Sequence, residues 1–84
     1  MLLIYTPNMN ADKGKWTIES RNLIKAILGR QGIKYEQLVE KLNAIGVEES
    51  VSGIKGKIHR GTYSFIFMIQ VMKALDVNIL RVKE

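Results

Sequence analysis

Residues 45–64 read IGVEESVSGIKGKIHRGTYS. Three of its apolar side chains recur at the spacing of one helix face, namely Val51, Ile54 and Ile58. They predict a helix over about residues 48–60. Gly61 suits the position just past the end of that helix, and Ser64 is a good N-cap for another. The stretch therefore predicts two helices joined by a short turn.

The helical pattern continues on both sides of this stretch. Upstream, apolar stripes predict helices over about residues 15–31 and 35–44, followed by Gly32 and Gly46 as stops. Downstream, a helix that begins after Ser64 and runs to about Leu75 is apolar around nearly its whole circumference, so we expect it to be the buried centre. Four aromatic residues lie on apolar stripes and are expected in the core, Trp16, Tyr35, Phe65 and Phe67, whereas Tyr63 lies in a turn and is expected to be exposed.

These elements predict one all-α domain, a compact bundle of four to five helices. Residues 1–14 are expected to form an N-terminal arm with a polar loop from Pro7 to Gly14, and residues 15–84 the domain itself. The tail 77–82 is compatible with a short strand or one more helical turn. If it is a strand, Leu2–Tyr5 is its partner, within one chain or between two.

Composition restricts the class of protein. The chain has 84 residues, of which 46% are hydrophobic and 25% charged, as in a folded globular domain. It contains no cysteine, which excludes disulfides, thiol catalysis and cysteine-based zinc sites. No apolar run approaches the roughly 20 residues of a membrane span. We expect a protein that is cytoplasmic and has no membrane partner.

The positive charge is concentrated in one part of the chain. The formal net charge is +5, and no acidic residue occurs between Glu49 and Asp76. Glu48 and Glu49 fall in the expected first turn of helix 48–60, where they suit the helix dipole. A one-sided basic segment is the pattern expected for a polyanionic partner, although a solvated basic surface would look the same.

Helices 35–44 and 48–60 have the layout of a helix-turn-helix unit, in which the second helix enters the DNA major groove. With its apolar residues turned inward, helix 48–60 points Ser52, Gly53, Gly56 and Arg60 outward and has Lys55, Lys57 and His59 on its flanks. Thr62 and Lys34 are expected to steady it on phosphates. The two glycines would let a DNA backbone approach closely, or else bend the helix or let another helix pack against it.

The sequence gives little support for a KH-type loop, a metal site or an enzyme active site. Gly53-Ile-Lys-Gly56 is similar to the GxxG loop of KH domains, which clamps single-stranded nucleic acid, but here apolar helical spacing runs through it. His59 is the only histidine and has no second ligand or activating partner at a suitable spacing. We expect no enzymatic activity, no catalytic, cofactor or metal site, and no small-molecule substrate.

The stretch from about Trp16 to Val77 resembles a family of small bacterial helix-turn-helix domains of unknown function, related in layout to the Cro and lambda-repressor class. The residues that carry the resemblance are Tyr35, Leu38, residues 45–49, Ile54, Lys57, Arg60, Gly61, Tyr63, Ser64, Phe67, Gln70, Ala74 and Leu75. The chain departs from a typical Cro-like sequence in its longer turn before helix 48–60. It also lacks the usual acidic residue near that helix's end and has glycine where asparagine is common.

The resemblance implies a lambda-repressor-like fold and no assigned activity. Together with the charge pattern, it leads us to expect a DNA-binding transcriptional regulator or accessory nucleic-acid-binding protein. A homodimer is expected, because one module of this size rarely binds DNA tightly and paired half-sites solve that problem. The alternative is a protein-interaction or dimerisation module on the same fold.

Overall fold

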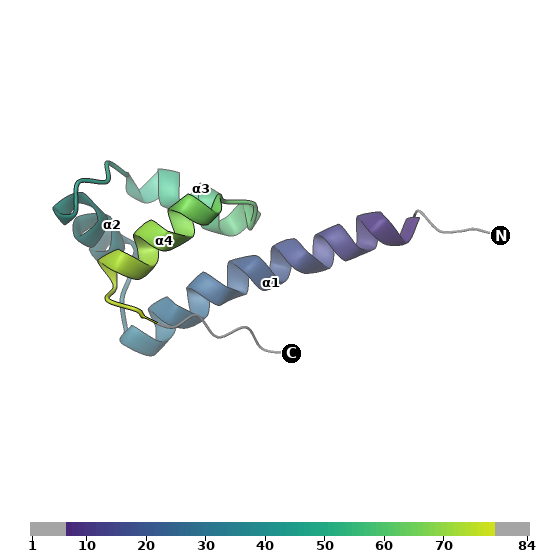
Figure 1. The fold of residues 1–84 in the computed structure, drawn as a ribbon, viewed down its shortest axis with the longest axis horizontal. Helices are drawn as coiled ribbons and strands as arrows, with labels where there is room; N and C mark the ends of the chain where they lie inside the picture. The colour runs from purple at the N-terminus through teal and green to yellow at the C-terminus, as the bar shows by residue number, and fades with distance from the viewer. Residues whose placement is uncertain (1–6, 79–84) are drawn as a thin grey trace.

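A computed structural model of the chain describes residues 7–78 and, from Gly14 on, their side chains. Over this range the chain forms four helices, α1 (Pro7–Gln31), α2 (Tyr35–Ala44), α3 (Val51–Arg60) and α4 (Phe65–Ala74), and no strand (Figure 1). The expected all-α class is confirmed. The predicted pairing of Leu2–Tyr5 with the tail lies almost wholly outside the described residues, apart from residues 77 and 78, which are not in a strand.

Helix α1 begins earlier than expected, since the segment from Pro7 to Gly14 is helical and the prediction of a polar loop there is wrong. Proline is well suited to a first helical turn, because its fixed φ fits the helix and its missing N–H needs no partner there. Gly14 lies within the helix at a cost of about 1 kcal/mol relative to alanine, which a long helix tolerates. The N-terminal half of α1 projects beyond the other three helices, which gather at its C-terminal half (Figure 1).

Helix α2 has the bounds that its apolar stripe predicts, whereas α3 starts at Val51 rather than near Glu48. The cause is Ser50, whose hydroxyl accepts a hydrogen bond of 3.1 Å from the Gly53 amide and so caps the helix. The predicted place of Glu48 and Glu49 in the first turn is therefore wrong. Both belong to the connection 45–50, and the Glu49 amide donates to the Asn43 side-chain oxygen over 3.3 Å.

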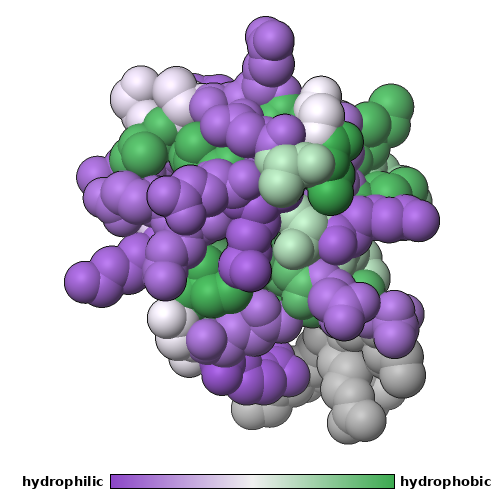
Figure 2. Space-filling view, turned by 90° about the vertical axis from the view of Figure 1, so that its left-hand side faces the viewer, coloured by the Kyte–Doolittle hydropathy of each residue, from purple (hydrophilic) through white to green (hydrophobic). Residues whose placement is uncertain are grey.

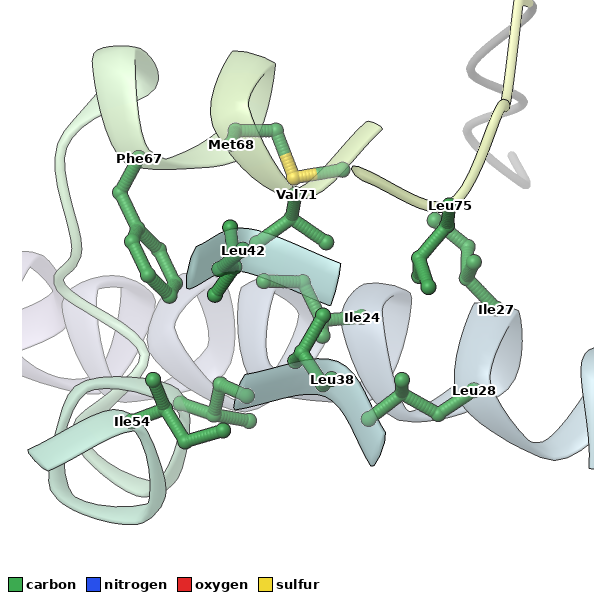
Figure 3. Packing of buried hydrophobic residues seen from close by; sticks show 11 residues of the cluster. Ile24, Ile27, Leu28, Leu38, Leu42, Ile54, Phe67, Met68, Val71 and Leu75 are labelled. Carbon is green, nitrogen blue, oxygen red and sulfur yellow. The ribbon is translucent and has the colours of Figure 1, made fainter. Parts of the chain in front are cut away.

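The core is formed by residues from all four helices (Figure 3). Side chains from α1, α2 and α4 meet around Leu38 and Leu42, which have no solvent exposure, and α3 adds Ile54 and Ile58. The Gln31 side chain at the end of α1 donates a 3.1 Å hydrogen bond to the Leu75 carbonyl. The full set of buried hydrophobic residues is Ile24, Ile27, Leu28, Leu38, Leu42, Ile54, Ile58, Phe67, Met68, Val71 and Leu75.

Helix α4 is buried on one side only. Phe67, Met68 and Val71 point into the core, but Phe65 is 70% exposed, Ile66 68% and Ile69 42%. The expectation that this helix forms a fully enclosed centre is therefore wrong. Three other helices in so small a domain cannot surround a fourth, and α4 keeps an apolar face in solvent. Trp16 is 60% exposed instead of lying in the core, because it belongs to the N-terminal half of α1, which projects beyond the other helices (Figure 1).

The turn between α3 and α4 is docked onto α1. Gly61 is buried and adopts φ +70°, and a Cβ built on it would lie 2.1 Å from the Thr17 carbonyl oxygen. Two residues later, the Tyr63 hydroxyl donates a 2.7 Å hydrogen bond to the Ser20 carbonyl. The Tyr63 ring lies 5.7 Å from the Phe67 ring. Tyr63 is thus half-buried, contrary to the expectation of an exposed residue, because it anchors the turn on α1.

We expect Tyr63→Phe to lower the free energy of unfolding by about 1 kcal/mol, because the Ser20 carbonyl loses its donor. Burial raises the pKa of the Tyr63 hydroxyl above its usual 10.0. A raised pKa means that the folded state holds the proton more tightly, so the stability it contributes is present below pH 10 and lost above it. Denaturant unfolding between about pH 8 and 11 checks this. If the variant loses stability above pH 10 as steeply as the parent, Tyr63 is not responsible.

Candidate nucleic-acid interface

The two helices predicted to form a helix-turn-helix unit, α2 and α3, contact each other, and α3 also packs on α1. Ile54 and Ile58 are completely buried, so they fix which side of α3 faces the core. The opposite side faces solvent. Of the predicted contact residues, Ser52, Lys55, His59 and Arg60 are exposed there, and Thr62 is exposed just after Gly61. The structure therefore places most of the predicted contact residues on or beside one open helix face.

The two glycines of α3 are half-buried, and each has a local neighbour. A Cβ on Gly53 would lie 3.0 Å from the Ser50 hydroxyl, so this glycine accommodates the tight N-cap. A Cβ on Gly56 would lie 3.2 Å from Nη1 of Arg60, whose side chain lies back across it. Both glycines are inside a helix, whereas a KH-type GxxG loop must lie between two helices. The GxxG similarity therefore has no matching geometry here.

Lys57 has a different environment from the other predicted contact residues. Its ammonium lies 2.5 Å from Oε2 of Glu49 and 4.9 Å from the centre of the Phe67 ring. The Glu49 side chain is only 10% exposed, so this carboxylate balances the Lys57 charge at close range. Lys57 thus ties α3 to the connection before it and to α4. The pairing spans eight residues across a helix start, a spacing that gives no periodic signal in the sequence.

Lys34 and Lys55 both lie close to Tyr35. Lys34 is the N-cap of α2, where its amide donates a 2.8 Å hydrogen bond to Oε1 of Gln37. The Lys55 ammonium lies 6.0 Å from the ring centre of Tyr35, the residue directly after Lys34. Both lysines are exposed. The start of α2 and the outer side of α3 therefore form one basic surface, which we call the basic face and define as Lys34, Ser52, Lys55, Arg60 and Thr62.

The surface around α2 is mostly polar. Figure 2 looks at the end of the molecule that carries α2 in Figure 1, and hydrophilic residues dominate it, with hydrophobic ones in smaller areas between them. No group of three or more potential metal-ligating side chains occurs within the part of the chain that the structure describes. Among the helices of residues 7–78, none is both long and apolar enough to cross a membrane.

The described residues define a small all-α domain with a basic face on its second and third helices. The chain belongs to the DUF6471 family, described as a domain of unknown function, whose pattern matches residues 16–80. This match includes all of α2, α3 and α4 and most of α1. Neither the curated proteins nor the solved structures contain a significant match to the chain.

Proposed function

We propose that this chain is a DNA-binding domain of the helix-turn-helix type that acts without catalysis, as a transcriptional regulator or an accessory DNA-binding protein. The observation that carries the proposal is the exposed side of α3. It presents Ser52, Lys55 and Arg60 to solvent and contains no carboxylate, while Ile54 and Ile58 anchor its other side in the core. A rigidly anchored basic helix with an open outer face is the element that such domains insert into the major groove.

The arrangement of the neighbouring helices supports a lambda-repressor-like layout. Helix α2 contacts α3, as the first helix of such a unit does, and the basic face continues from α3 onto the start of α2 at Lys34. A lysine there can bind a backbone phosphate while α3 lies in the groove. The connection 45–50 is longer than a Cro-like turn, and the Glu49–Lys57 ion pair holds it against α3.

The composition of the basic face favours phosphate contacts over base recognition. Arg60 can donate two parallel hydrogen bonds to a guanine edge, and Ser52 can donate or accept one. The centre of the outer side, however, carries Gly53 and Gly56, which have no side chain to read a base. We therefore propose binding with limited intrinsic sequence specificity, dominated by charge.

A titration against salt tests the proposal. The basic face has three cations that can each contact a phosphate, namely Lys34, Lys55 and Arg60. For a mixed-sequence duplex of about 20 base pairs, we therefore expect the affinity of each bound chain to fall roughly fortyfold between about 50 and 200 mM salt. Fluorescence anisotropy of labelled DNA measures this. Binding that does not change with salt, or no binding at the lowest salt, would exclude the proposed mode.

The Glu49–Lys57 pair supplies a second test. Glu49→Gln removes the carboxylate that balances Lys57, so we expect affinity for the same duplex to rise about threefold at low salt. Because Lys57 is partly exposed, the loss of the pair should lower the free energy of unfolding by only about 1 kcal/mol. Anisotropy and chemical denaturation measure the two effects. Unchanged or reduced affinity would show that the Lys57 charge does not reach the DNA.

A further inference from the structure

The outer face of α4 presents large apolar side chains to solvent. Phe65, Ile66 and Ile69 are all exposed and lie at i, i+1 and i+4, which places them on one side of the helix. They oppose Phe67, Met68 and Val71, which face the core. Single exposed apolar residues are ordinary, whereas adjacent ones on one helix face form a contiguous patch of the kind found at interaction sites. We call these three residues the α4 patch.

The charges around the α4 patch restrict what can cover it. Helix α4 contains no acidic residue, and its only charged side chain is Lys73, which is exposed one turn beyond Ile69. The middle of the patch is uncharged, so two copies can meet there without burying an unpaired charge. A cation stands at one end and an aromatic ring, Phe65, at the other. The face is therefore complementary to itself when one copy is reversed.

We propose that the α4 patch is covered by a second copy of this chain, with the two α4 helices antiparallel about a two-fold axis near Ile69. In that arrangement Lys73 of each copy lies beside Phe65 of the other, and Ile66 meets Met72, whereas a parallel pairing would place the two Lys73 side chains together. Among the described side chains, three lysines already lie over aromatic rings, Lys15 over Trp16, Lys55 over Tyr35 and Lys57 over Phe67. A two-fold contact of this kind is closed and self-complementary.

The small area of the α4 patch predicts a weak dimer. A phenylalanine exposed to this degree presents roughly 100–170 Å², and two isoleucines add a similar amount, so the contact lies below the ~1,000 Å² of a stable interface. The dimer should therefore form with a dissociation constant in the micromolar range, on the order of 10–100 µM. Each copy has a net charge of +5, so the copies repel one another and salt should strengthen the contact.

This salt dependence makes the inference independent of the proposed function. DNA binding weakens as salt rises, whereas the apolar contact between two basic chains strengthens. Self-association is measured without DNA, so either proposal can fail while the other holds. The experiment is sedimentation of the whole chain at about 5–500 µM protein and about 50–500 mM salt. We expect a monomer–dimer equilibrium that shifts toward the dimer at high salt.

Neutral substitutions locate the contact. The double variant Ile66→Gln/Ile69→Gln removes apolar surface from the patch without changing charge, and we expect the dissociation constant to rise at least about tenfold. Ile18→Gln is the matched control, because Ile18 is also a half-exposed isoleucine but lies on α1. It should leave the dimer unchanged. Circular dichroism confirms that both variants fold, which the exposure of these side chains leads us to expect.

Several results would overturn the inference. They are a chain that stays monomeric at every salt concentration, a double variant that dimerises as well as the parent, and equal weakening by Ile18→Gln. The first result would show that a second copy does not cover the patch. The second or third would place the contact elsewhere. A dimer weakened by the patch variant alone would support the inference, and further weakening by Lys73→Gln would support the antiparallel arrangement.

Discussion

Gly61→Ala should lower the free energy of unfolding by about 3 kcal/mol or more, out of roughly 4–12 kcal/mol expected for a domain of this length. The left-handed backbone at φ +70° costs a residue with a Cβ about 1–2 kcal/mol. The added Cβ would also lie 2.1 Å from the Thr17 carbonyl oxygen, a backbone atom that cannot turn aside. The turn must then move off α1, which disturbs the 2.7 Å bond from Tyr63 to Ser20.

Thermal unfolding measures the effect, and we expect the melting temperature to fall by more than about 12 °C. Alanine variants at two other glycines show how much of the loss comes from the left-handed backbone and how much from the clash between the added Cβ and the Thr17 carbonyl oxygen. Gly32 and Gly46 also have positive φ, +65° and +87°, but nothing lies within 4 Å of a Cβ built on either. Their alanine variants should lose only about 1–2 kcal/mol. If Gly61→Ala costs no more than these two, the turn is not packed against α1 as described.

Reversing two charges of the basic face should have the largest effect on function. We expect the double variant Lys55→Glu/Arg60→Glu to bind a DNA duplex at least about a hundredfold more weakly at low salt, because two phosphate contacts become two repulsions. Both side chains are exposed on α3, so the fold should be retained. Anisotropy of labelled DNA gives the affinity, and circular dichroism checks the helix content.

The control must change the net charge equally at another place. Lys25→Glu/Lys41→Glu also lowers the net charge by four units, from +5 to +1, at exposed positions on α1 and α2 outside the basic face. We expect it to weaken binding by less than about tenfold, since only the long-range field changes. Equal losses in the two double variants would show that net charge alone drives binding and that α3 has no special part.

Several elements of the fold follow from local sequence. The bounds of α2, the N-cap at Ser64 and the end of α3 at Gly61 are as predicted, because each depends on neighbours within one helical turn. Where two local signals compete, the prediction fails. At the start of α3, the Ser50 cap prevails over the acidic residues before it. At the start of α1, the polar residues after Pro7 predict a loop, but the chain is helical from Pro7 on.

The candidate site was predicted in part. Helical periodicity gives the side of α3 that Ile54 and Ile58 turn inward, and hence which cations are exposed. It does not give the partner of Lys57, because Glu49 approaches from an irregular connection, nor the placement of Lys55 near Tyr35, which depends on how α2 packs on α3.

The sequence alone predicted the all-α class, the apolar side of each helix and the concentration of positive charge after Glu49. Periodicity and capping act within a few residues and need no knowledge of the rest of the chain. Packing decided the rest. Whether an apolar face is buried depends on how many neighbours reach it, and α4, apolar around nearly its whole circumference, keeps Phe65 and Ile66 in solvent. Likewise, Gly61 is buried and Tyr63 is anchored only because their turn meets α1 more than forty residues earlier in the chain.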